Sequence, residues 1–209
     1  TSFAKTSIRP STYDASNMQA STTWMERNNA TQGGGSVHVS CAYPPGEDEG
    51  SSSAALVNEK NKDISITLEN IGVRESRANV RGGGAMYVQG GTNRTAKCVT
   101  TVLRSMFDQN SATAPGADGG AVSVVGGAKL NMRASRIAGN RAVGGSGAGI
   151  TVKGSGTEIL VEDTRIEDNV ASLGAGGVQL SSGCVGKLYG VRLERNLAEN
   201  GNGGGVECI

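Results

Sequence analysis

The sequence is poor in the features that usually mark an enzyme, a nucleic-acid-binding protein or a membrane protein. Aromatic residues make up 3% of its 209 residues, which is less than a compact globule usually contains. His38 is the only histidine, and 20 basic against 19 acidic side chains argue against a nucleic-acid partner. There is no apolar stretch long enough to span a bilayer, no phosphate-binding loop, no dinucleotide fingerprint and no zinc-ligand spacing. We therefore expect no cofactor, metal or membrane span.

What the sequence does contain is a repeat. A corner of the form apolar-x-x-Asn-x-Ala occurs six times, once with Ser in place of Asn, and each copy precedes a glycine-rich turn and an apolar-x-apolar triplet. The last four corners, at positions 110, 140, 169 and 196, are 30, 29 and 27 residues apart. A fixed period in this range is typical of a solenoid.

The apolar residues alternate with a period of two in short runs, and no amphipathic helix is indicated. We therefore predict an all-β fold, a right-handed parallel β-helix of about six coils, in which equivalent positions stack into columns. Two inward columns are expected at Met25, Val73, Phe107, Ile137, Ile166 and Leu193, and at Leu68, Val102, Met132, Val161 and Leu188. A polar ladder with a structural role is expected at Asn28, Ser76, Asn110, Asn140, Asn169 and Asn196.

The repeats cover residues 25–209, preceded by residues 1–24 as a partial first coil or a cap. An insertion at 40–62 has loop chemistry and a local acidic run, and such insertions are the usual place for binding. The chain stops on the strand that contains Val206, which would leave a sheet edge open. We therefore expect a segment of a longer protein that contacts other protein chains through its β-helix ends or the loop.

Four cysteines allow three disulfide pairings, and the sequence leaves the choice open. Cys41, Cys98 and Cys184 lie in turns just beyond strands, where bridging is sterically easy. Cys208 aligns with inward positions, so a buried small hydrophobe is as well supported there as a disulfide. Two glycosylation sequons begin at Asn29 and Asn93, of which Asn93 lies in a polar insertion and is the better candidate. Together these features favour an oxidising, extracellular or cell-surface location.

The charged residues do not indicate a catalytic site. Arg136, Arg165 and Arg192 form one outward column beside several acids, and a solvated, salt-bridged sheet face is favoured there over a binding strip for acidic sugars. The position of Asp163 is Arg104, Ala134 and Gly190 in neighbouring coils, so the acids form no column. His38 points outward from an alternating strand without a partner at a recognisable spacing. No catalytic residue is predicted.

Two motifs carry a family resemblance. Gly-Gly-Ala-Val at 119–122 and Phe-x-x-Asn at 107–110 are similar to the repeats of chlamydial polymorphic outer-membrane proteins and of related repeat regions in surface proteins of algae and other protists. The resemblance covers roughly residues 25–209. It implies a secreted or surface-displayed β-helix of the pectin-lyase-like kind, used for adhesion or as a structural element.

Two functions follow as expectations. The first is a non-catalytic extracellular or cell-surface structural or adhesive module, part of a filament or multiprotein surface assembly, with other chains and surface glycans as its partners. The alternative is a carbohydrate-active enzyme of the polysaccharide lyase or glycosidase kind. The missing acid column and the scarcity of aromatic platforms for sugars favour the first.

Overall fold

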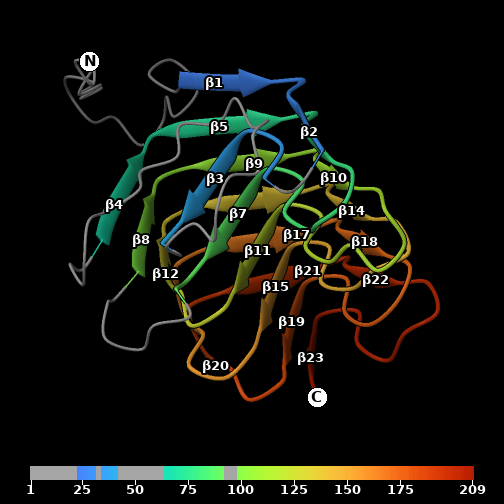
Figure 1. Ribbon diagram of the computed structural model, residues 1–209. Helices are drawn as coiled ribbons and strands as arrows, with labels where there is room; N and C mark the ends of the chain where they lie inside the picture. The colour runs from blue at the N-terminus through green and yellow to red at the C-terminus, as the bar shows by residue number, and fades with distance from the viewer. Residues whose placement is uncertain (1–22, 32–33, 42–63, 92–97) are drawn as a thin grey trace.

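A computed structural model describes residues 23–31, 34–41, 64–91 and 98–209. The described chain is built from short strands and contains no helix (Figure 1). Every strand pairing is parallel and joins a strand to its equivalent in the next coil. The predicted parallel β-helix is therefore confirmed. Most of the predicted partial coil at 1–24, most of the loop at 40–62, and Asn93 lie outside the described residues.

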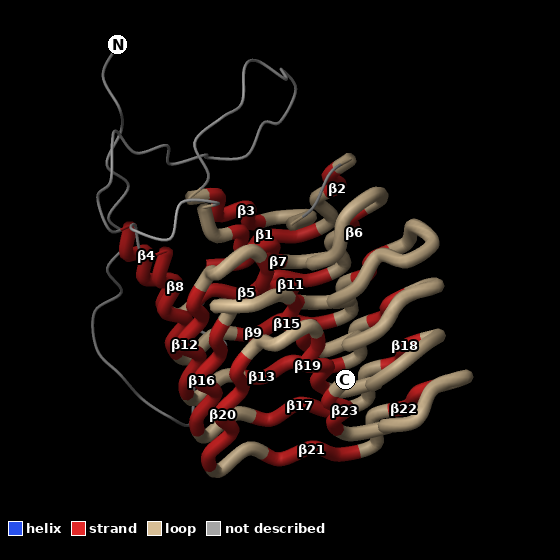
Figure 2. Tube along the Cα trace, turned by 60° about the horizontal axis from the view of Figure 1, so that its bottom comes forward, coloured by secondary structure: helices blue, strands red, loops and turns tan. Residues whose placement is uncertain are grey.

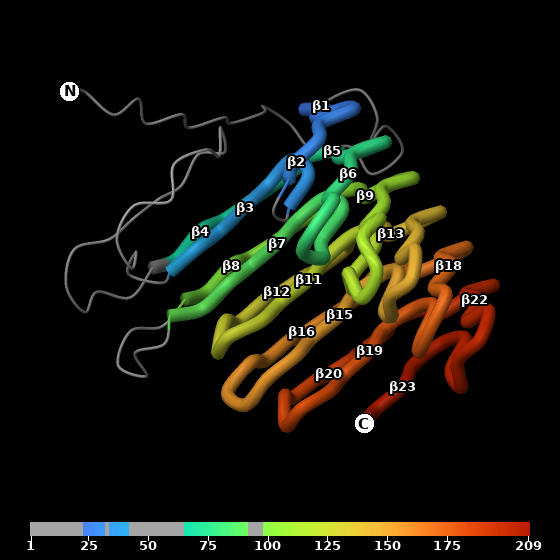
Figure 3. The backbone as a smooth tube through the Cα atoms, turned by 45° about the vertical axis from the view of Figure 1, so that its right-hand side comes forward, coloured from blue at the N-terminus to red at the C-terminus, as the bar shows by residue number. Residues whose placement is uncertain are grey.

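Four strands make up each coil, and the chain passes through the four sheets in the same order each time (Figure 3). Sheet I consists of β1 (Thr23–Glu26), β5 (Ile71–Arg74), β9 (Met106–Asp108), β13 (Arg136–Ala138), β17 (Arg165–Glu167) and β21 (Arg192–Glu194). Sheet II consists of β2 (Asn29–Ala30), β6 (Arg77–Ala78), β10 (Ser111–Ala112), β14 (Arg141–Ala142), β18 (Val170–Ala171) and β22 (Leu197–Ala198).

The other two sheets complete the coil. Sheet III consists of β3 (Val37–Ser40), β7 (Met86–Gln89), β11 (Val122–Val125), β15 (Ile150–Lys153), β19 (Val178–Ser181) and β23 (Val206–Cys208). Sheet IV consists of β4 (Ile64–Glu69), β8 (Cys98–Leu103), β12 (Lys129–Arg133), β16 (Glu158–Glu162) and β20 (Val185–Tyr189). Three sheets have six strands and the fourth has five, so the described chain makes about five full turns and part of a sixth.

The core lies between sheets I, III and IV. The two inward columns expected from the sequence pair in register, as in Phe107 with Ile137 and Val102 with Met132. Phe107, Ile137 and Val102 are fully buried, because the coils above and below cover each of them. At about 1.5–3 kcal/mol for each large apolar side chain removed from water, these columns supply much of the driving force for folding.

The inner face of sheet II has room only for small side chains. Its two-residue strands place an alanine inward in every coil, and Ala78, Ala112, Ala142 and Ala171 are fully buried. The glycine-rich turn that follows brings one coil's backbone against the next. A Cβ atom on Gly84 would lie 2.2 Å from the carbonyl oxygen of Gly120. Glycine at this position is therefore a steric requirement of the stacking.

The sequence predicts two strands per coil, whereas the structure has four. One reason is a bend between sheets IV and I at a residue with a left-handed backbone, whose φ lies between 47° and 60°. These residues are Asn70, Arg104, Ala134, Asp163 and Gly190. A second left-handed column, with φ between 50° and 64°, separates sheets I and II at Arg27, Glu75, Gln109, Gly139, Asp168 and Arg195. Most of these residues are not glycine, so each bend costs free energy that the neighbouring hydrogen bonds must offset.

Candidate functional site

The asparagines of the expected ladder are hydrogen-bonded to one another through the bend between sheets I and II. Nδ2 of Asn110 donates to Oδ1 of Asn140 at 3.0 Å, and Nδ2 of Asn140 donates to Oδ1 of Asn169 at 2.9 Å. The same acceptor oxygens also receive the main-chain N–H of the preceding asparagine, at 2.9 and 3.0 Å. Asn196 continues the pattern as acceptor from Asn169 at 2.9 Å. The ladder thus satisfies main-chain groups that the left-handed bend removes from sheet pairing.

The first coils depart from this pattern. Ser76 replaces asparagine and cannot reach the side chain of Asn28 directly. Instead, Nδ2 of Asn28 donates to the hydroxyl of Ser36 at 2.9 Å, and the hydroxyls of Ser36 and Ser76 share a hydrogen bond of 2.7 Å. The serine from the glycine turn thus restores the connection that the shorter side chain of Ser76 interrupts.

A second polar ladder, which the sequence analysis missed, lies at the bend between sheets IV and I. Ser105, Ser135 and Thr164 occupy equivalent positions and are buried. Their hydroxyls donate to the carbonyl two residues earlier, at 2.8 to 2.9 Å, and accept the main-chain N–H of the previous coil. The column ends at Ile71 on one side and Val191 on the other. Only three coils therefore have a hydroxyl side chain at this position, and serine and threonine are too common for three equally spaced copies to be recognised in the sequence.

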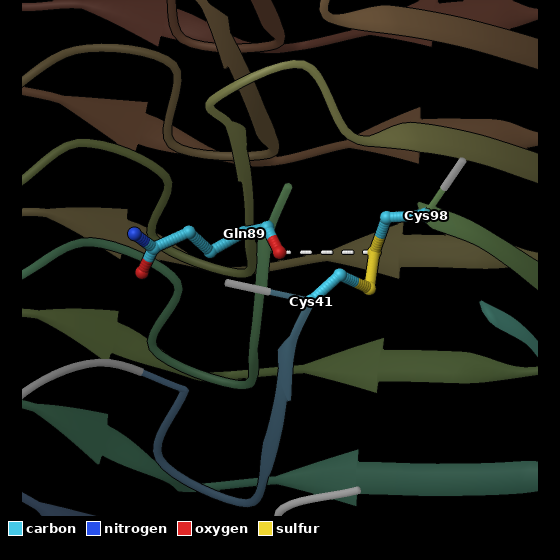
Figure 4. The surroundings of a disulfide bond; sticks show 3 residues. All are labelled: Cys41, Gln89 and Cys98. Atoms are coloured by element: carbon cyan, nitrogen blue, oxygen red, sulfur yellow. Dashed lines mark hydrogen bonds between the residues drawn. A yellow bond between two sulfur atoms is a disulfide. The ribbon is translucent and has the colours of Figure 1, made fainter. Parts of the chain in front are cut away.

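Cys41 and Cys98 form a disulfide with a Cα–Cα distance of 5.8 Å and a sequence separation of 57 residues (Figure 4). The bond links the end of β3 to the beginning of β8 in the next coil. Between them runs the main chain of Gln89, whose carbonyl oxygen accepts the N–H of Cys41 at 2.9 Å and lies 3.7 Å from Sγ of Cys98. The disulfide therefore joins two coils at the corner between sheets III and IV.

Cys184 and Cys208 are free thiols. Cys208 pairs with Leu180 in the inward column of sheet III, as the sequence alignment indicates, but its side chain is exposed. In the described structure the Cys208 side chain is exposed rather than buried, and β23 pairs with β19 alone. Cys184 is half-buried and donates to the carbonyl of Val152 at 3.3 Å. Burial raises the pKa of the Cys184 thiol, and the nearby Cys208 raises it further.

Of the two sequon asparagines, only Asn29 lies in the described chain. It is exposed in β2, and its Oδ1 accepts a hydrogen bond from Nδ2 of Asn79 at 2.8 Å. Its side chain therefore lies on the outer surface of sheet II, where a glycan would point into solvent.

Ion pairs between coils cover the outer face of sheet I. Glu167 is buried beneath two arginines, at 2.7 Å from Nε of Arg136 and 3.3 Å from Arg195. Arg195 also donates twice to Asp168, at 2.7 and 2.9 Å. These hydrogen bonds hold the pKa of Asp168 below its ordinary value. The salt-bridged face that the sequence indicates is therefore present over part of this surface.

The rest of that surface differs. Arg136, Arg165 and Arg192 are Cα partners in adjacent coils, so they stand in one column as expected. Among the residues that the structure describes, Arg165 and Arg192 form no ion pair, in contrast to Arg136. The column lines an open groove of about 530 Å³ that follows the corner between sheets IV and I.

The residues that line this groove come from the bend between sheets IV and I in four successive coils. Strands β9, β13, β17 and β21 of these coils lie one above the other in Figure 2. Ala134 and Gly190 lack long side chains, which leaves the corner hollow, and Met106 supplies an apolar wall. Asp163 is the one acid among the described lining residues, and its carboxylate lies 3.8 Å from Arg133 outside the groove. We name this surface, lined by Met106, Ala134, Ser135, Arg136, Asp163, Thr164, Arg165, Gly190 and Arg192, the arginine groove.

His38 lies on the outer face of sheet III, where its ring meets the ring of Tyr87 edge-on with centroids 5.3 Å apart. Burial lowers the pKa of His38, and the positive charge of Arg81 adds to this effect. Its Nε2 atom is buried without a hydrogen-bond partner. The imidazole is thus a neutral, half-buried ring beside an aromatic neighbour, with no nucleophile or acid paired to it in the described chain.

The described residues contain no group of three or more His, Cys, Asp or Glu side chains that is arranged to hold a metal ion. In the same part of the chain there is no helix with the length and apolar character that a membrane crossing requires. Comparison of the sequence and structure with family models, curated proteins and solved structures gives no match.

Proposed function

We propose that the chain is a non-catalytic extracellular or cell-surface module with a structural or adhesive role in a filament or multiprotein surface assembly. The observation that carries this proposal is the disulfide between Cys41 and Cys98, which closes between adjacent coils. Disulfides persist in oxidising compartments and are reduced in the cytosol of most cells. The exposed sequon residue Asn29 supports the same location.

The use of the polar side chains supports a structural role. The amide groups of Asn110, Asn140 and Asn169 are occupied by bonds that hold one coil to the next. The hydroxyls of Ser135 and Thr164 are occupied in the same way at the other bend. Such side chains stabilise the solenoid and are not available as reactive groups.

Other protein chains are the first partners in this proposal, through the β-helix ends or the loop at 40–62. The alternative is a carbohydrate-active enzyme of the polysaccharide lyase or glycosidase kind. A glycosidase site needs two facing carboxylates, whereas Asp163 is the one acid that lines the arginine groove in the described chain.

Two measurements on the protein from its native source test the proposal. The first is peptide mapping without reduction, which is expected to give a Cys41–Cys98 linked peptide and a glycan on Asn29 or Asn93. The second is labelling of intact cells with a membrane-impermeant amine reagent, which is expected to modify the protein. Free thiols at Cys41 and Cys98 together with protection from the reagent would overturn the extracellular proposal.

A further inference from the structure

We propose that Cys184 and Cys208 form a second disulfide between coils, a reversible one that fastens β23 to β20 under oxidising conditions. The inference goes beyond the proposed function, because it concerns a different pair of cysteines and a bond that can open and close. Its basis is the position of the two thiols, their accessibility to small molecules and the few contacts that hold β23.

The two thiols belong to adjacent coils and face one hollow. Cys208 is the Cα partner of Leu180 in the parallel pair of β19 and β23, so the two backbones are about 4.8 Å apart. Cys184 follows Leu180 after a tight turn at Ser182 and Gly183, whose backbones are both left-handed. The two cysteines line the same hollow of about 330 Å³. A bond between them is therefore compatible with the existing order and register of the strands.

Sheet IV already has a disulfide at this position in an earlier coil. The residue just before the paired segment is Cys98 in β8, and its equivalents in the next three coils are Ala128, Thr157 and Cys184. Cys98 bonds to Cys41, which lies just beyond a sheet III strand of the preceding coil. Cys208 lies in a sheet III strand of the coil that follows Cys184. Bonds from this column to sheet III of an adjacent coil therefore suit the solenoid.

The two pairs differ in their accessibility to small thiols. Cys98 is 1% exposed, whereas Cys208 is exposed and Cys184 is half-buried. Exposed disulfides are reduced more readily than buried structural ones. We therefore expect the Cys184–Cys208 bond to open under milder reduction than the Cys41–Cys98 bond.

The bond forms by two exchange steps with a small disulfide such as oxidised glutathione. The exposed Cys208 thiolate attacks one sulfur of that disulfide, which releases one glutathione thiolate and leaves a mixed disulfide on Cys208. The Cys184 thiol then loses its proton to water and attacks Sγ of Cys208, which releases the second glutathione thiolate. Two protein thiols are thereby oxidised, and the two glutathione sulfurs are reduced. For the second step the Cys184 side chain must turn away from the carbonyl of Val152, to which it donates at 3.3 Å.

The bond would change how firmly β23 is held. In the described structure β23 pairs with β19 alone, and a side-chain hydrogen bond from Nε2 of Gln179 to Glu207 at 3.2 Å joins the two strands. Val206 and Cys208 of β23 are exposed. Segments with few buried contacts open locally at a small cost in free energy. A covalent bond to the residue that precedes β20 would keep β23 in place, and reduction would release it.

The test is to equilibrate the purified chain in glutathione buffers that range from reduced to oxidised, block the remaining thiols with N-ethylmaleimide and map the peptides without reduction. A Cys184–Cys208 linked peptide is expected, and its formation should require a glutathione ratio at least about tenfold more oxidising than that of Cys41–Cys98. Closure of this loop of roughly 25 residues is expected to raise the thermal midpoint by about 5 to 10 °C. Hydrogen exchange of the β23 amides is expected to slow about tenfold or more.

The matched controls are Cys184→Ser and Cys208→Ser. Thr157 occupies the position of Cys184 in the preceding coil, and its hydroxyl donates to a main-chain carbonyl at 2.9 Å, so a hydroxyl group suits this column. Each variant is expected to keep the Cys41–Cys98 bond and to carry glutathione on its one remaining free cysteine. In both, the β23 amides should exchange at the same rate in reduced and oxidised buffers. Circular dichroism shows whether each variant is folded.

Three results on the wild type would contradict the proposal. The first is glutathione on both Cys184 and Cys208 without a linked peptide, and the second is a Cys208–Cys208 bond between two copies of the chain. The third is a linked peptide that forms at the same glutathione ratio as Cys41–Cys98, because such a bond would not open separately. Each would leave the proposed function intact, since that function rests on the Cys41–Cys98 disulfide.

Discussion

The substitution Asn140→Ala tests how much the asparagine ladder contributes to stability. Asn140 is fully buried, and its side chain makes four hydrogen bonds: two from Nδ2, to Asn169 and Phe107, and two to Oδ1, from the main chain and side chain of Asn110. The alanine variant leaves two donors of Asn110 without their acceptor. A buried donor without a partner costs about 1–3 kcal/mol, so we expect the free energy of unfolding to fall by about 4 kcal/mol.

Asn196→Ala is the matched control. Asn196 accepts the equivalent two hydrogen bonds from Asn169, at 3.1 and 2.9 Å, but it is only partly buried. Water can reach the two donors that this variant exposes, so the expected loss is about 1 kcal/mol. Urea unfolding followed by circular dichroism, with the disulfide intact, measures both losses. Equal losses in Asn140→Ala and Asn196→Ala would refute the argument, because they would show that burial of the ladder does not set its contribution.

Three further predictions concern other parts of the fold. Gly84→Ala is expected to lower the free energy of unfolding by about 3 kcal/mol or more, because the added Cβ atom would clash with the next coil. Gly183→Ala has open space around the added atom but a left-handed backbone, so a loss of about 1 kcal/mol is expected. Urea unfolding measures both losses. Cys41→Ser/Cys98→Ser is expected to lower it by about 4 kcal/mol, from the loss of a 57-residue cross-link, and an unchanged thermal midpoint would contradict this. The folded-state pKa of His38 is lowered by burial, so its contribution to stability is present above about pH 6.5 and declines as the pH falls below that value. Unfolding of wild type and His38→Gln from neutral to acidic pH checks the sign, since the variant should lose less stability over this range.

Much of the fold could be predicted from sequence because its columns repeat. Phe107, Ile137 and Ile166 are each large, apolar and equally spaced from an asparagine, and stacking in register is what such a pattern produces. The four-strand coil could not be predicted in the same way. Asp163 and Asp168 adopt left-handed backbones, yet neither residue type identifies a bend as glycine would. The run from Glu158 to Glu167 therefore looks like one continuous strand in sequence, although the chain bends at Asp163 between β16 and β17.

The candidate site was only partly predictable. The column of Arg136, Arg165 and Arg192 follows from the repeat, but which arginines are paired depends on side-chain reach across coils. Glu167 forms ion pairs with Arg136 and Arg195. No rule applied to the sequence could have predicted these pairs in preference to an ion pair between Glu167 and Arg165. The hollow in the groove arises from Ala134 and Gly190, whose importance appears only when three coils are stacked.

The disulfide bears on how successive coils align with one another during folding. Coils of similar sequence can stack one step out of register during folding and still form most of their columns and much of their asparagine ladder. Cys98 has Ala128 and Thr157 as its equivalents in the next two coils, and neither can bond to Cys41. A misaligned first coil would thus leave both thiols reduced. We therefore expect oxidation of Cys41 and Cys98 to favour the correct alignment and to oppose later slippage of the first coils.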